Sequence, residues 1–262
     1  MKNYSSVKYQ KNFIQQVIFR IDFLEFVKSA EIFDKNILDD ILSHFPFSRI
    51  NQVVKFNNID ININATSPIS PPNISTQYEE GIQREFTMEN EANRLILSNK
   101  FLIVDFRKYT TFEEMHNSFK KTIDVIFEKN KITVTRTGIR YINIFDPTKM
   151  KIQKNFFSGV IASAFSTALS SELINAHLVR SITLAEYVVN EMRLNFRYGV
   201  YNKAYPNPVK STDFVLDFDC FTTEPFHLPD EINKTIILGH DSIQSLFEDS
   251  ISDKLREIMK DG

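Results

Sequence analysis

The stretch FLIVDFRKYTT (residues 101–111) has a counterpart in DFVLDFDCFTT (residues 213–223), which lies 112 positions further along the chain. In this alignment Asp105 falls on Asp217, and each aspartate is followed by a phenylalanine. In both stretches the apolar residues alternate with polar ones or form a cluster, as is typical of buried strands. Both stretches end in a pair of threonines. The match indicates that one structural segment occurs twice in this chain.

Two further matches keep the same order along the chain. IDVIFE (residues 123–128) resembles IQSLFE (residues 243–248), and VIFRIDF (residues 17–23) aligns roughly with IRYINIF (residues 139–145). Because short matches arise by chance but rarely in a conserved order, we predict a tandem duplication. The two units would be residues 1–131 and residues 132–262.

The spacing of apolar residues predicts the same elements in both units. Predicted strands are residues 14–23, 53–63, 82–88, 93–98 and 101–107 in the first unit, and 134–145, 179–188, 191–200 and 213–221 in the second. Predicted helices are residues 35–45, 111–128, 153–169 and 230–259. Residues 64–80 contain three prolines and are predicted to form a loop.

This element order predicts an α+β fold. Each unit has an apolar sheet face that its helices must cover, so the two units are expected to share one curved, mainly antiparallel sheet with the helices on one side. A duplicated order of this kind resembles the saddle of TATA-binding proteins. The resemblance concerns architecture and does not fix function.

Composition bounds the class of protein and its location. The net charge of −2 gives no general attraction to phosphate, unlike the basic surplus of most dedicated nucleic-acid binders. The single cysteine excludes an internal disulfide and suits a reducing compartment. The polar N-terminus lacks a signal peptide's apolar core, and no apolar run is long enough to cross a membrane. We therefore expect a cytoplasmic protein without a membrane partner.

Several kinds of cofactor or catalytic site are not predicted. The six glycines form neither a Walker A loop nor a Rossmann fingerprint. The five histidines lack metal-ligand spacing, and one cysteine cannot build a structural zinc site. No GxSxG elbow is present, and Cys220 alternates onto the apolar face of its strand. We predict no cofactor and no metal, and favour a protein that is not an enzyme.

One polar group of residues lies on the predicted hairpin of the second unit. Three residues share a face of its first strand: Arg193, Asn195 and Arg197. Three share a face of its second strand: Asp213, Asp217 and Asp219. Antiparallel pairing is expected to place Arg197 by Asp217 and Arg193 near Asp219. The face is either a ladder of ion pairs or a ligand-binding surface, and its aspartates would bind Mg²⁺ only in competition with the arginines.

A second group lies on the strand that begins the second unit. Arg136 and Arg140 share one side of this strand, and Tyr141 and Asn143 take the other. The arginines either brace the junction between units or recognise a carboxylate or phosphate. The ligand-binding candidates are therefore Arg136, Arg140, Asn143, Arg193, Arg197, Asp217 and Asp219.

Two further segments leave alternatives open. The stretch 201–210, with Tyr201, Tyr205, Lys203 and Lys210, fits either single-stranded nucleic acid or a plain polar hairpin tip. The C-terminal helix keeps an apolar stripe to Ile258, which either forms a homodimer contact or covers the sheet.

The segments TRTGIRYIN (135–143), FLIVDFRKYTTFEEMHNSF (101–119), FVLDFDCFTTE (214–224) and FEDSISDKLREIM (247–259) resemble a sporadically distributed prokaryotic family of about this length. The function of that family is not settled. Its patchy distribution implies mobile genetic elements, and hence a role in phage defence or in toxin–antitoxin pairs.

Three functional hypotheses follow. The first is a non-catalytic binding or assembly protein that recognises a protein partner. The second is a nucleic-acid or nucleotide sensor that uses the concave sheet face. The third is a metal-dependent hydrolase that uses Asp217 and Asp219.

Overall fold

The structure is a computed structural model of the chain. It describes residues 9–24, 39, 41, 47–57, 77–87, 93–98, 100–129, 132–146, 150, 161–162, 165, 179–202, 207, 213–226 and 228–260.

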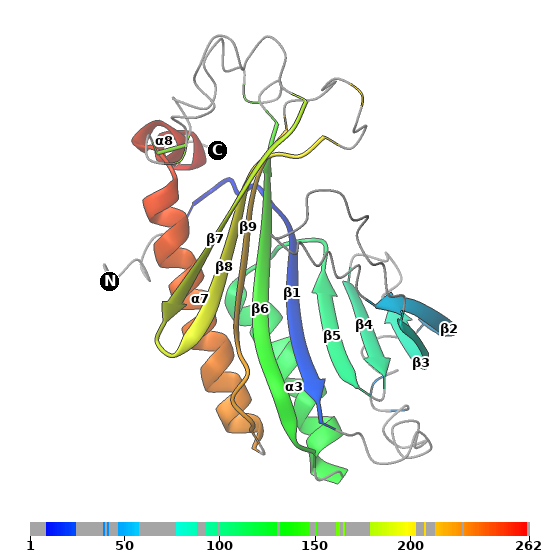
Figure 1. The fold of residues 1–262 in the computed structure, drawn as a ribbon. Helices are drawn as coiled ribbons and strands as arrows, with labels where there is room; N and C mark the ends of the chain where they lie inside the picture. Colours follow the sequence, from blue (N-terminus) through cyan, green and yellow to red (C-terminus); the bar gives the residue numbers. More distant parts are fainter. Residues whose placement is uncertain are drawn as a thin grey trace, which may run out of the picture.

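The described chain is an α+β fold built on one nine-stranded sheet, in which every pairing is antiparallel (Figure 1). The strands are β1 (Ile14–Phe23), β2 (Phe47–Asn57), β3 (Gln77–Thr87), β4 (Asn93–Ser98), β5 (Phe101–Phe106), β6 (Val134–Phe145), β7 (Ser181–Val189), β8 (Met192–Val200) and β9 (Phe214–Thr222). The helices are α3 (Phe112–Lys129), α7 (Pro229–Ser250) and α8 (Asp253–Lys260).

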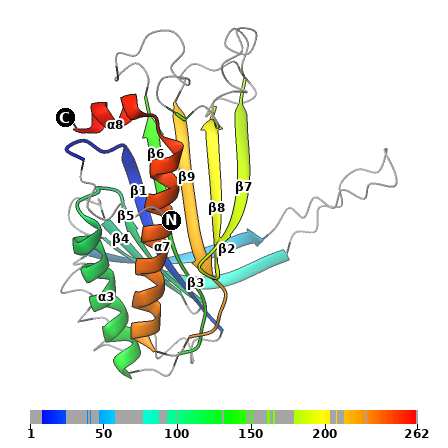
Figure 2. The same cartoon turned by 90° about the vertical axis from the view of Figure 1, so that its left-hand side faces the viewer.

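Strands β1 and β6 lie side by side at the centre of the sheet. From β1 the order runs outward through β5, β4, β3 and β2, and from β6 it runs through β9, β8 and β7. On each side the strand that precedes α3 or α7 lies next to a central strand, and the side of β1 has one strand more than the side of β6. Figure 2 shows the sheet twisting so far that β2 and β3 cross the direction of β7 and β8.

Strict alternation of side chains sets the two faces of the sheet. On β1 the side chains of Val17, Phe19 and Ile21 are fully buried, while the residues between them are partly exposed. On β6 the side chains of Ile139 and Phe145 are buried on the same face. Because neighbouring strands keep this alternation in register, one face of the sheet is a continuous apolar core.

Helices α3 and α7 cover that apolar face (Figure 2). The ring of Phe119 in α3 stacks on Phe19 of β1 with centroids 4.9 Å apart. Helix α7 lies against β6 and β9, where Ile232 and Ile236 are fully buried. At Gly239 a Cβ atom would come within 2.9 Å of the Ile139 side chain, so the missing side chain lets α7 approach β6 closely.

Two strand predictions and one loop prediction need correction. Strand β2 is Phe47–Asn57 rather than residues 53–63, and β3 is Gln77–Thr87, so residues 77–80 of the predicted loop belong to a strand. The cause is the unbroken pairing of β2 with β3 at eleven positions, which holds polar residues such as Asn51 and Gln52 in extended conformation. Residues 58–63 and 64–76 lie outside the described residues.

The long C-terminal helix predicted for residues 230–259 is also wrong, because the chain leaves the helix at Ile251. This residue is extended, with φ −100° and ψ 152°, and forms a bridge with Ile161. Ile161 lies inside the predicted helix 153–169, of which only residues 161, 162 and 165 are described. The helix prediction is therefore wrong at residue 161. Of the predicted helix 35–45 only Asp39 and Ile41 are described, and both are helical.

The final helix, α8, packs on its own chain. Leu255 and Met259 are buried, and the Met259 carbonyl oxygen accepts a hydrogen bond of 3.0 Å from the Lys11 amide. Glu248, at the end of α7, accepts hydrogen bonds from Tyr9 (2.8 Å) and Arg256 (3.1 Å). Of the apolar stripe that favoured a homodimer contact through these last turns, Ile251 and Leu255 are thus buried inside the chain, whereas Ile258 is partly exposed.

Candidate functional site

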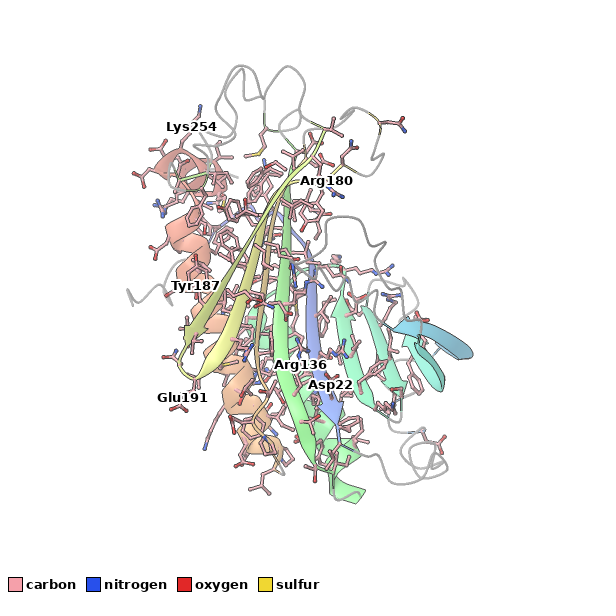
Figure 3. All side chains as sticks on the ribbon, in the orientation of Figure 1. Asp22, Arg136, Arg180, Tyr187, Glu191 and Lys254 are labelled. Atoms are coloured by element: carbon pink, nitrogen blue, oxygen red, sulfur yellow. The ribbon has the colours of Figure 1, made fainter. Side chains whose placement is uncertain are left out.

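The face of the sheet opposite α3 and α7 carries the predicted polar groups, and we call it the open face (Figure 3). No described helix covers it. Its charged residues on the central strands and their neighbours form ion pairs, between strands in every case except the pair of Arg20 and Asp22 within β1. They are Arg20, Asp22, Arg94, Asp105, Arg136, Arg140, Arg197, Asp217 and Asp219.

Asp217 is the centre of the ion-pair group that joins β6, β8 and β9. Its Oδ1 accepts a hydrogen bond of 2.7 Å from Nε of Arg140, and its Oδ2 accepts one of 2.7 Å from Nη2 of the same guanidinium. Nη1 of Arg197 lies 3.4 Å from Oδ2. This bidentate pair raises the pKa of Arg140, with burial opposing the shift. Because Arg197 stands opposite Asp217 in the register, the pairing expected from the sequence is confirmed.

Asp219 pairs with Arg136 and not with Arg193, which corrects the second expected contact. Nη2 of Arg136 lies 3.3 Å from Oδ2 of Asp219. Arg193 instead stands opposite Phe221 and is exposed. The reason is that β9 has two neighbours, and the partner of Asp219 comes from β6 rather than from the hairpin with β8.

The guanidinium of Arg136 is also stacked on an aromatic ring. It lies 4.3 Å from the centroid of the Phe221 ring, and burial lowers its pKa although Asp219 opposes that shift. The backbone at Gly138 makes this arrangement possible, because a Cβ there would lie 2.7 Å from Cβ of Phe221. The glycine of the TRTGIRYIN segment is therefore required by packing on the open face.

A further ion-pair group, on β1, β4 and β5, was missed by sequence reasoning. Asp105 is buried and accepts hydrogen bonds from Nε2 of Gln16 at 2.7 Å and from Nε of Arg94 at 3.0 Å. Arg107 lies 3.4 Å from the same carboxylate, and Arg94 also reaches Glu85. The alignment of Asp105 with Asp217 was the signal that could have identified this group.

The remaining candidates do not join these groups. Asn143 points to the other side of β6, is buried beneath the helices and donates a hydrogen bond of 3.4 Å to the Leu216 carbonyl oxygen. Asn195 stands opposite Asp219 on the open face. Asp213 lies one residue before β9. Of the stretch 201–210, the structure describes only residues 201, 202 and 207, so Tyr205, Lys203 and Lys210 lie outside the described residues.

The open face offers little catalytic chemistry within the described part of the chain. Its aspartates are engaged by guanidinium groups, and no group of three or more histidine, cysteine or acidic residues could hold a metal ion there. Cys220 is buried on the other face, and burial raises the pKa of its thiol to about 12. A thiolate nucleophile at neutral pH is therefore disfavoured at this position.

A second polar cluster is buried between the sheet and its two helices. Nδ1 of His240 in α7 lies 3.0 Å from the hydroxyl of Tyr141, and the imidazole stacks on Phe112 of α3 with centroids 3.8 Å apart. Burial lowers the pKa of His240 to about 4, with a smaller contribution from His116. Burial also raises the pKa of Tyr141 well above its usual value. The contact is therefore made by a neutral imidazole and a neutral phenol.

Comparison with known proteins adds no relative, since neither protein-family models nor curated proteins match this chain. Among the described residues, no helix has the length and apolar character needed to span a membrane.

Replacing Asp217 with alanine should lower the free energy of unfolding by about 2 kcal/mol, because two guanidinium groups lose their carboxylate on a half-buried face. Urea unfolding at pH 7 measures the effect. Asp124→Ala is the matched control, because its ion pair with Lys120 on α3 is exposed and should contribute no more than about 0.5 kcal/mol. Equal effects of the two substitutions would contradict the central place given to Asp217.

The buried imidazole of His240 should make the protein less stable in mild acid. The folded-state pKa of about 4 lies below the ordinary value of 6.5, so the unfolded chain takes up the proton first as the pH falls. The stabilising contribution of His240 to the free energy of unfolding is present above pH 6.5 and declines towards pH 4. The loss between pH 7 and pH 5 amounts to about 2 kcal/mol. His240→Gln should remove this part of the pH dependence in urea unfolding. Parallel pH profiles of wild type and variant would refute the assignment.

Proposed function

We propose that this chain is a non-catalytic binding protein whose open face recognises a protein partner. The observation that carries the proposal is the pairing of charge across that face. Asp105, Asp217 and Asp219 are each bonded to an arginine from a neighbouring strand, and Asp22 is bonded to Arg20 of its own strand, so positive and negative groups alternate over a short distance. A surface of this kind matches a partner that also carries charges of both signs, which is the ordinary composition of protein surfaces.

The same pairing weighs against the nucleic-acid alternative. A polyanion is held by guanidinium groups that are free to neutralise phosphates. The described arginines on β6, Arg136 and Arg140, are already bonded to Asp219 and Asp217. The group around Asp217 holds two arginines against one carboxylate, which leaves a small local positive charge. The metal-dependent hydrolase alternative gains no support, because Asp217 and Asp219 hold guanidinium groups where they would have to hold a cation.

We also infer that the platform arose by tandem duplication of residues 1–131 and 132–262. The matching orders β1-β5-β4-β3 and β6-β9-β8-β7 support this inference, with β2 as an additional strand on the first side. So does the matching chemistry, since Arg94 faces Asp105 across one strand pair as Arg197 faces Asp217 across the other. The likeness to the saddle of TATA-binding proteins belongs to the same inference.

The pairing register also refines the alignment of the two central strands. Asp105 stands opposite Ile18, and Asp217 stands opposite Ile142. Gln16 and Arg140, each two positions before those isoleucines, are then equivalent and bond to equivalent aspartates. This shifts the match by two residues from the one based on the sequence alone.

Family resemblance supplies a biological setting for the proposal. A partner-binding protein of a mobile element would act in phage defence or in a toxin–antitoxin pair, inside the cytoplasm. The partner is then expected to be encoded near this chain.

The test is co-purification from the native host with Arg193→Glu and a matched control. Arg193 is exposed on the open face, so reversing its charge should cause loss of the partner without unfolding the sheet. Lys254→Glu makes the same reversal on exposed α8, away from the open face, and should keep the partner (Figure 3). Mass spectrometry identifies the bound protein.

Recovery of the chain alone at every salt concentration would overturn the proposal, as would equal recovery of the partner by both variants. If the bound material were instead nucleic acid, released steeply by salt, the nucleic-acid alternative would replace it.

A further inference from the structure

Strand β7 forms one edge of the sheet and pairs on one side only, with β8. Nine consecutive residues, Ser181 to Val189, are in register with β8 without a bulge. The outer row of backbone N–H and C=O groups has no strand beside it among the described residues. Natural edge strands are usually protected by lysine, proline or a bulge, because an open row of this kind recruits another strand. The β7 sequence, SITLAEYVV, contains none of these, and its one charged residue is Glu186.

Both faces of β7 expose apolar side chains. On the open face the exposed fractions are 80% for Val188, 52% for Leu184 and 42% for Ile182. Tyr187, on the other face, is 37% exposed. Helix α7 lies over β6 and β9 and does not extend over β7 (Figure 2). The strand therefore projects beyond the helical layer as an apolar edge, and exposed apolar surface of this kind marks an interaction site.

We propose that a second copy of this chain pairs with β7, strand against strand and antiparallel, across a two-fold axis perpendicular to the sheet. The sequence of β7 fits itself in the register that uses all nine residues, with Ala185 opposite the partner's Ala185. Ile182 then faces the partner's Val188 on the open face, and Leu184 faces the aliphatic stem of the partner's Glu186. On the other face, Thr183 faces the partner's Tyr187. Apolar side chains meet in cross-strand pairs that stabilise antiparallel sheets.

Charges at the two ends of β7 favour a second copy of this chain as the pairing partner. Arg180 immediately precedes β7, and Glu191 lies in the turn that follows it, so they stand at opposite ends of the strand (Figure 3). Both side chains are exposed. Antiparallel pairing brings Arg180 of each copy beside the partner's Glu191, which gives two favourable contacts related by the axis. A parallel arrangement would place like charges together.

The dimer would join the two sheets into one continuous sheet. Because a two-fold axis perpendicular to the sheet keeps each face on its own side, both open faces point the same way. The proposal does not depend on the proposed function, since it rests on β7 rather than on the ion pairs of β6 and β9. A dimer would also offer two equivalent open faces to a partner.

Sedimentation equilibrium of the full-length protein tests the proposal. Wild type should have the mass of a dimer at micromolar concentration, and Leu184→Glu should shift it to a monomer, because each new carboxylate would stand opposite the partner's Glu186. Leu238→Glu is the matched control on the outer face of α7, where Leu238 is 45% exposed. This variant should remain a dimer. A monomeric wild type would overturn the proposal, and so would a dimer that Leu238→Glu breaks and Leu184→Glu leaves intact.

A cysteine scan tests the register independently of mass. Ala185→Cys places two thiols opposite each other across the axis, within reach of a disulfide, and should give a covalent dimer under mild oxidation. Thr183→Cys places them about 13 Å apart along the strands and should not. The native Cys220 is buried and does not compete. Equal cross-linking of both variants would contradict pairing through β7 in this register. Failure of both variants to cross-link, while the wild type is a dimer, would contradict it as well.

Discussion

Backbone pairing between β1 and β6 is the constraint on which the rest of the structure depends. Val17 stands opposite Tyr141 at the middle of this pair, and every other strand reaches the centre through one of the two. We call this β1–β6 pairing the seam. Without it each half would present a long unpaired central strand, with its N–H and C=O groups open to any other strand. The seam also aligns the apolar faces of both halves, so that α3 and α7 cover one core rather than two.

Electrostatics on the open face follow from the same arrangement. The strands that flank the seam, β5 and β9, carry Asp105 and Asp217, and each of these carboxylates is bonded from both sides. A buried carboxylate is stable in this position only when neighbouring strands supply donors. The result is a face that is fixed in shape and nearly neutral over short distances, which favours recognition of mixed charge over attraction to a polyanion.

Sequence patterns predicted the parts of the fold that local periodicity determines. Strands β1, β4 and β6 have the predicted bounds, because their alternation of apolar and polar residues is strong. Strand β2 was displaced because Ser48, Asn51 and Gln52 carry no such signal and become extended only through pairing with β3. The end of α7 at Ile251 depends on a bridge to Ile161, ninety positions earlier, which local spacing cannot reveal.

Site residues were predictable where the contact is made within one hairpin and not where it crosses to a third strand. Arg197 and Asp217 were paired correctly, whereas the partner of Asp219 was sought on β8 and lies on β6. In the group around Asp105, the contact with Arg94 lies within the β4–β5 hairpin and could have been predicted in the same way, whereas the Gln16 donor comes from β1. Such contacts follow from strand order, and a pattern read along one strand does not contain that order.

Native-state hydrogen exchange tests the central claim most directly. If the seam holds the two halves together, amides of β1 and β6 that bond to each other should exchange only through global unfolding, with the free energy found by denaturant titration. Exchange of these amides through a smaller opening, while β8 and β9 stay protected, would contradict the claim. The two halves would then be separately stable units in contact, and not one sheet built around a common centre.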